Sequence, residues 1–212
     1  MTATVLVEKQ SFRIATMSID KLKPHEKGCP LYVQLLRQEL LKDGTLRYPI
    51  IVDAKTCVIL DGMHRWLALR SLGYTRIPVM LVDSYQDQKI RVGSRRIHKY
   101  ADYSTSHVTK DEIISAGLSG RLMKPRSTRH FFPFSKFQRI DYPLRLLGRQ
   151  VPQAISKYVA GMTRRESHLS IQEWIKEISE ELEFLTKRRE EVENERNDLL
   201  NRIKELDNLP AF

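Results

Sequence analysis

Short apolar runs alternate with stretches of helical spacing along the first hundred residues. Leu31, Leu35, Leu36 and Leu40 recur at the period of an amphipathic helix, and Gly44 follows at a position where helix ends favour glycine. Two β-branched runs, 48–52 and 57–60, flank a turn-like segment and predict a hairpin. The predicted helices are 30–42 and 64–72, and the predicted strands are 11–17, 48–52, 57–60, 77–83 and 89–92.

The pattern changes beyond residue 108. Thr109 and Glu112 have the spacing of a capping box, which predicts a helix from Lys110 to about Ser119. Residues 121–165 keep neither the helical nor the strand period. They are therefore predicted to be irregular, apart from a turn at 142–144.

The carboxy-terminal segment, 167–209, has a coiled-coil pattern. From Ile171 to Leu206, core positions alternate by four and three, and arginine occupies two of them, Arg189 and Arg196. The segment could fold back on its own domain. Because the apolar stripe is narrow and the other faces are densely charged, the pattern favours an arm that forms a homodimer through residues 171–206.

Charge divides the chain in the same place. The net charge is +10, but residues 167–212 carry seven basic and twelve acidic residues, a net −5. The remainder carries 29 basic and 14 acidic residues, a net +15. Such a balance suits nucleotide phosphates or a nucleic-acid backbone, although a chain rich in solvated lysine and arginine would give it too.

Several protein classes are not indicated. No stretch approaches eighteen uninterrupted apolar residues, so we expect no membrane span. The amino terminus has no basic region followed by a long apolar run, which argues against a secretory signal. Cys29 and Cys57 match neither a disulfide framework nor a metal-ligand spacing, so we expect a reducing cytoplasm.

The turn Asp61-Gly62-Met63-His64-Arg65 joins a predicted buried strand to a predicted helix. Free N–H groups in the first turn of a helix, together with the helix dipole, make such a junction an anion site. Gly62 allows a ligand close to the backbone, while His64 and Arg65 add donors. In the alternative interpretation, Asp61 caps the helix and His64 and Arg65 are surface residues.

Three separated motifs resemble the free L-serine kinase family within the ParB/sulfiredoxin-like superfamily. They are Lys23-Pro-His-Glu26, the turn 61–65, and Ser127-Thr-Arg-His-Phe131, and the resemblance spans about residues 14–147. It implies an α+β fold, a nucleotide-binding domain with a small mixed sheet and helices. It also implies phosphoryl transfer from ATP or ADP, with Mg²⁺, to the hydroxyl of free L-serine.

The resemblance assigns a role to each motif. Glu26 would orient or deprotonate the serine hydroxyl, and Asp61 would contact the acceptor or a magnesium ion. The donor phosphates would be held by Gly62, the Met63 backbone, His64 and Arg65. The serine carboxylate and the phosphoryl group would be bound by Thr128, Arg129 and His130.

One departure from the family motif is Met63, which stands where the family has histidine. Sulfiredoxins place a reactive cysteine here, and a thioether cannot supply that thiolate, so sulfiredoxin chemistry is excluded. The P-loop and protein-kinase motifs are absent.

The alternative function is a ParB-like nucleotide-dependent DNA-binding or regulatory protein, which the basic run 91–99 and the basic body suit. The predicted domains are 1–95 for nucleotide binding, 96–165 for substrate binding, and 167–209 for the arm.

Overall fold

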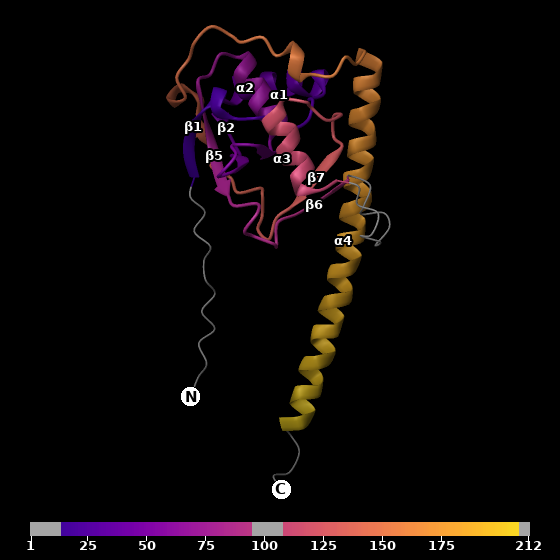
Figure 1. Ribbon diagram of the computed structural model, residues 1–212. Helices are drawn as coiled ribbons and strands as arrows, with labels where there is room; N and C mark the ends of the chain where they lie inside the picture. The colour runs from indigo at the N-terminus through magenta and orange to yellow at the C-terminus, as the bar shows by residue number, and fades with distance from the viewer. Residues whose placement is uncertain (1–13, 95–107, 208–212) are drawn as a thin grey trace. The chain divides into compact units, whose positions relative to one another are not determined.

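A computed structural model describes residues 14–94 and 108–207 (Figure 1). The chain divides into two compact units, Met1–Ser167 and His168–Phe212. The first unit is an α+β structure with a small mixed sheet, as predicted. The proposed boundary between residues 95 and 96 stays a prediction.

The central sheet has four strands in the order β1-β5-β3-β4. β1 (Ile14–Ser18) pairs antiparallel with β5 (Arg76–Val82), and β5 pairs in parallel with β3 (Ile50–Asp53). β3 pairs antiparallel with β4 (Ile59–Asp61), which confirms the predicted hairpin. The first part of the predicted strand 11–17 lies outside the described residues.

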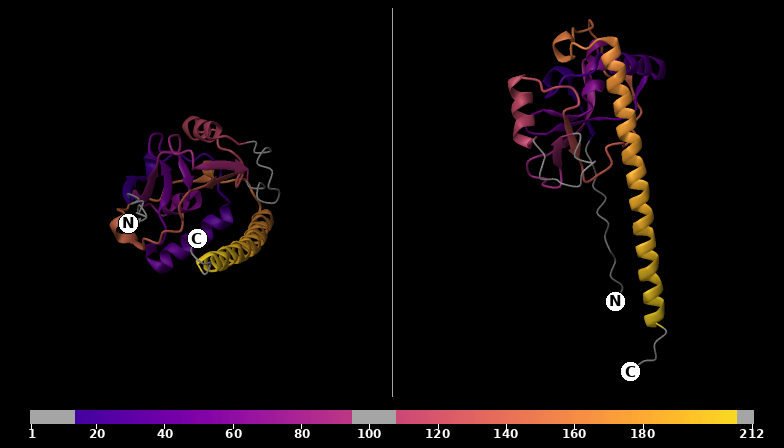
Figure 2. Two further views of the ribbon diagram at one scale, coloured as in Figure 1. Left: turned by 90° about the horizontal axis from the view of Figure 1, so that it is seen from below. Right: turned by 90° about the vertical axis from the view of Figure 1, so that its right-hand side faces the viewer.

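Helices cover both faces of this sheet. α1 (Pro30–Asp43) and α2 (Met63–Ser71) share one apolar cluster with alternate strand residues such as Ile50 and Val52. α3 (Lys110–Ser119) packs on the other face against residues such as Ile51 (Figure 2). Burial on both faces explains why β3 is a continuous apolar run rather than an alternating one.

The segment 121–165 contains more regular structure than predicted. β7 (Thr128–Phe131) pairs antiparallel with β6 (Arg91–Ser94), and β8 (Tyr142–Pro143) pairs with β2 (Thr45–Leu46). Short 3-10 turns occupy Ile19–Lys21, Leu144–Leu146 and Ser156–Tyr158. Most of the segment is irregular, as predicted, but the prediction missed these two short strands because pairing with distant strands, rather than local periodicity, makes them.

α4 (Arg164–Asp207) is a single helix of 44 residues, which is about 66 Å at 1.5 Å per residue. Thr163 and Glu166 form a capping box at its start, with the Thr163 N–H donating to Glu166 over 2.7 Å. The predicted long carboxy-terminal helix is confirmed. Among the described residues, no helix is both long and apolar enough to cross a membrane.

Candidate active site

The turn after β4 forms the predicted junction of strand and helix. Gly62 has φ +97°, a left-handed value that suits glycine, and α2 begins at the next residue. The Trp66 N–H donates to the Gly62 carbonyl over 3.0 Å, so the N–H groups of residues 63–65 precede the helical ladder. The Asp61 carboxylate contacts the side chains of Arg65 and Lys136 rather than N–H groups of the first turn, which argues against the interpretation that Asp61 caps α2.

Arg65 turns back over this junction. Its Nη1 donates to the carbonyls of Tyr48 and Pro49 over 3.1 and 2.8 Å, and its Nη2 donates to Asp61 Oδ2 over 2.6 Å. Both terminal nitrogens of the guanidinium fork are thus engaged within the protein. A phosphate could take the predicted bidentate contact from Arg65 only by displacing these partners.

Asp61 lies between two cations. Lys136 Nζ approaches its other oxygen, Oδ1, at 3.4 Å, opposite the contact from Arg65. Burial by itself would raise the pKa of Asp61, but the charges of Arg65 and Lys136 outweigh it and hold the pKa below its ordinary value. Asp61 is therefore a carboxylate at neutral pH. No motif or spacing in the sequence pointed to Lys136.

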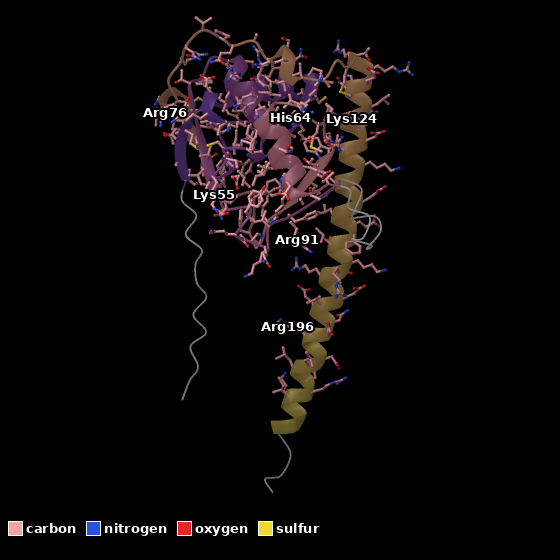
Figure 3. The ribbon with its side chains drawn as sticks, viewed as in Figure 1. Lys55, His64, Arg76, Arg91, Lys124 and Arg196 are labelled. Atoms are coloured by element: carbon pink, nitrogen blue, oxygen red, sulfur yellow. The ribbon has the colours of Figure 1, made fainter. Side chains whose placement is uncertain are left out.

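Met63 and His64, adjacent in the chain, lie in different surroundings. The Met63 side chain is 5% exposed and belongs to the core cluster, so this position can contact a ligand only through its backbone. His64 Nε2 accepts a hydrogen bond from the Cys29 N–H at 2.9 Å, and its ring meets Tyr32 edge to face. His64 thereby ties the loop that follows Glu26 to the start of α2. The position of His64 in the first unit is labelled in Figure 3.

Backbone bonds hold the loop that carries Glu26 on several sides. Lys23 exchanges hydrogen bonds with Cys57 and Ile59, each 2.9 Å long. The Lys27 N–H donates to the Met123 carbonyl over 3.0 Å, and the Gly28 N–H donates to the Tyr158 carbonyl over 2.9 Å. The loop is consequently fixed beside β4 without being part of a regular sheet.

Glu26, Thr128 and His25 form a buried chain of polar groups, with exposed fractions of 9%, 9% and 3%. His25 Nδ1 lies 2.7 Å from the Ile59 carbonyl, and its Nε2 lies 2.8 Å from Thr128 Oγ1. Thr128 Oγ1 in turn lies 3.2 Å from Glu26 Oε2. Two of the three family motifs therefore meet here, at the strand that leads into the third.

The three residues predicted to bind serine and the phosphoryl group, Thr128, Arg129 and His130, do not all point to the same side of β7, because side chains alternate along a strand. Thr128 and His130 are buried, whereas Arg129 is half-buried and its guanidinium lies over Phe131 at 5.4 Å. His130 meets His25 edge to face with ring centroids 5.6 Å apart. Burial, and then the neighbouring His25, lower the pKa of His130 to about 3, while the Asp61 charge opposes them.

The donor groups of this site do not form a metal cage. Among the described residues, no cluster of three histidine, cysteine or acidic side chains could hold a metal ion. Asp61 does not fit a direct Mg²⁺ ligand in this arrangement, because a cation already contacts each of its oxygens. The Mg²⁺ expectation stays a prediction that rests on donor phosphates, which share the ion with protein carboxylates and water in kinases.

Solved structures of free serine kinases share the fold of this chain. A structure of free serine kinase in complex with AMP superposes with a TM-score of 0.55, covering 65% of this chain and 94% of that one at 15% identity. The fold is that of free serine kinase. A free serine kinase in which one glutamate is replaced, solved in complex with ADP, matches with the same TM-score over 66% of the chain. No protein-family model matches the chain.

Sequence relatives point to the same superfamily. An ATP-dependent L-serine kinase of Staphylothermus marinus is 32% identical over 80 residues, which is 36% of this chain and 31% of that protein. A ParB-like protein of Sulfolobus acidocaldarius is 37% identical over 82 residues, or 39% and 40% of the two chains. The matches thus span about a third or slightly more of these relatives. The predicted resemblance to free serine kinases is confirmed by both comparisons.

Proposed function

We propose that this protein is a kinase that transfers a phosphoryl group from ATP or ADP to the hydroxyl of free L-serine, giving O-phospho-L-serine. The observation that carries the proposal is the meeting of three motifs around β4. His25 bonds the Ile59 carbonyl in β4, Glu26 follows His25, and β4 ends at Asp61 before the helix start. An acceptor base and an anion site are thereby held at a fixed separation.

The division of roles follows from burial and charge. Glu26 is the base for the serine hydroxyl, because it is a buried acidic side chain next to the hydroxyl of Thr128, in the loop beside β4. The N–H groups at the start of α2 receive the donor phosphates. Arg65 and Lys136 supply positive charge at the same turn, and Asp61 holds them in place.

The donor and the acceptor are proposed from relatives. The serine kinase of Staphylothermus marinus is named ATP-dependent, and that of Thermococcus kodakarensis is named ADP-dependent. Solved free serine kinases contain AMP or ADP. Both ATP and ADP therefore belong in the assay, with serine as the acceptor.

The test is direct detection of the product. The purified chain is incubated with L-serine, Mg²⁺ and either nucleotide, and O-phosphoserine is measured by ³¹P NMR. Glu26→Gln should abolish formation of product. Glu39→Gln is the matched control, because Glu39 forms an exposed ion pair with Arg47 and lies outside the site. Absence of product with both nucleotides would overturn the proposal.

A second function is favoured by the ParB-like relative and the basic first unit. In the predicted basic run 91–99, residues 95–99 lie outside the described residues. Figure 3 shows the labelled basic side chains Lys55, Arg76, Arg91 and Lys124 spread over the unit rather than gathered at one point. Binding to duplex DNA that weakens steeply with salt, in a chain that makes no O-phosphoserine, would support this function instead.

A further inference from the structure

The three hydrogen bonds from Ile59 through His25 and Thr128 to Glu26 need three protons to form together. A carbonyl cannot donate, so the bond from His25 to Ile59 places a proton on Nδ1. The bonds from Thr128 to His25 and to Glu26 need two further protons, and the threonine hydroxyl supplies one. For both bonds to form together, the remaining proton has to be on His25 Nε2 or on Glu26.

Burial excludes the first of these two places. Burial lowers the pKa of His25 to about 4, despite its bond to the Ile59 carbonyl, so the ring is neutral at pH 7 and Nε2 is an acceptor. His130, Asp61, Lys136 and Lys110 are the other titratable groups around the two rings. With His25 neutral, both bonds of Thr128 form together only when Glu26 carries the proton. Whenever Glu26 is ionised, as a base must be before it accepts a proton, Thr128 can donate to only one of these two neighbours at a time.

We propose that His25 and Thr128 hold Glu26 ready to accept a proton, and that the serine hydroxyl supplies the proton missing from this chain. This inference rests on the proposed kinase function. As the serine oxygen attacks the terminal phosphorus of the donor, its O–H bond breaks and an O–H bond forms on Glu26. The new O–P bond replaces the bridging P–O bond, whose electron pair leaves with the shortened nucleotide.

The protonated Glu26 then completes the chain. It donates to Thr128 Oγ1, and the Thr128 hydroxyl donates to His25 Nε2, so both bonds of the threonine are satisfied together. When the product leaves, Glu26 releases the proton to water. Thr128 and His25 act through Glu26, so they are positioning residues and not the base itself.

The decisive experiment follows the ¹⁵N resonances of His25 in the full chain without substrates. Glu26→Gln serves as a mimic of protonated Glu26, because its amide can donate to Thr128. We expect Nε2 to be unprotonated in the wild type and its resonance to move in Glu26→Gln. In the Thr128→Val background, the same substitution should leave that resonance unmoved. A proton on Nε2 in the wild type, or a shift that persists without the hydroxyl, would overturn the inference.

Kinetics provide the second measurement. Thr128→Val should lower kcat at least about tenfold, less than the loss of about 10²–10⁴ expected when a general base is removed, with little change in KM for the nucleotide. Thr128→Ser keeps the hydroxyl and should restore most of the rate. Equal losses in both variants would indicate a structural role and refute the inference. Because the NMR experiment needs no turnover, an inactive wild type would overturn the kinase proposal separately.

The apolar stripe of α4 supports an independent inference. Seven of its core-position residues are 47–65% exposed in the chain: Ile175, Ile178, Leu182, Leu185, Val192, Leu199 and Ile203. A single helix cannot bury such a stripe, so the arm calls for a partner helix. The positions of the charged residues identify which partner and which direction fit.

A parallel pair in register is disfavoured by the two arginines in the stripe. Arg189 and Arg196 occupy equivalent core positions, so each would face its own copy across the seam, and like charges would meet twice. An antiparallel pair centred between Glu190 and Glu191 removes both conflicts. Arg189 then faces Val192 of the second copy, and Arg196 faces Leu185 of the second copy.

Flanking charges fit the same antiparallel register. Arg188 lies beside Glu195 of the second copy, and the symmetry of the pair forms this contact twice. Arg189 also pairs with Glu193 along its own helix over 2.9 Å, so its charged end is held at the edge while its stem can cover the seam. We infer that α4 forms an antiparallel homodimer in this register.

Spin-label distances distinguish the two directions. Labels are placed by Asn194→Cys or Asn201→Cys on the outer face, with Cys29 and Cys57 replaced by alanine. In the antiparallel pair the axial offset grows from about 10 Å at 194 to about 32 Å at 201, at 1.5 Å per residue. In a parallel pair the two distances would be equal. Equal distances, a monomer in light scattering, or a dimer that survives Leu185→Lys would overturn the inference.

Discussion

Acidification should destabilise the first unit through two histidines that the fold buries as neutral rings. His25 and His130 are 3% and 8% exposed. Burial lowers the pKa of His25 to about 4, and burial together with the adjacent His25 lowers the pKa of His130 to about 3. Both values lie below 6.5, the ordinary pKa of histidine, which describes the unfolded chain.

The sign follows from proton uptake. Below pH 6.5 the unfolded chain takes up protons that the folded chain does not, so the free energy of unfolding falls with pH until the folded pKa values are reached. At pH 4.5 each ring accounts for a loss of about 2–3 kcal/mol. The two together remove about 5 kcal/mol, which is comparable to the whole stability of a modest domain.

Urea unfolding followed by circular dichroism, at pH 7.5 and at pH 4.5, measures this loss. The wild type should lose about 5 kcal/mol between the two conditions, and His130→Gln should lose only about half as much. Titration of carboxyl groups contributes alike to both proteins and cancels in the comparison. Equal losses in the wild type and in His130→Gln, or a wild-type loss below about 1 kcal/mol, would refute the reasoning.

Three further changes test the local structure by chemical denaturation. Gly62→Ala should lower the free energy of unfolding by about 1–3 kcal/mol, because φ is +97° and the new Cβ would lie 2.9 Å from Arg65 Nη2. An unchanged midpoint of denaturation would contradict this prediction. Thr109→Ala should lower the free energy of unfolding by about 1 kcal/mol, because it removes the capping box of α3. Thr109→Ser keeps the hydroxyl and should leave the free energy of unfolding unchanged. Asp53→Ala should lower the free energy of unfolding by about 3 kcal/mol or more, because buried Asp53 accepts hydrogen bonds from Ser84 and Thr56. A loss below about 1 kcal/mol would indicate that water replaces the carboxylate as the acceptor of these bonds.

Local signals in the sequence were enough for the helices of the first unit. α1 follows a leucine period and ends at Gly44, whose φ is +64°. α3 begins at a capping box that the structure contains in full, with both reciprocal bonds between Thr109 and Glu112. Each of these features involves residues close in sequence, so no knowledge of the tertiary fold was required.

The candidate site depended on contacts that sequence spacing does not encode. β7 is made by pairing with β6 across more than thirty intervening residues, and this pairing turns Thr128 inward and Arg129 to the other face. Arg65 is drawn to carbonyls at 48 and 49, and Lys136 reaches Asp61 from a loop without periodicity. Family motifs located the right segments, but the side-chain partners followed only from the fold.

The bond between His64 and Cys29 affects how this site can change by mutation. The donor is a main-chain N–H, so the identity of residue 29 does not matter to the bond, and only proline would remove it. At position 64 the identity of the residue does matter, because the side chain of His64 is the acceptor of this bond. Gly28 is restricted as well, since an added Cβ would collide with Leu67. A substitution at position 29 would therefore keep this bond, whereas any side chain added at position 28 would have to displace Leu67.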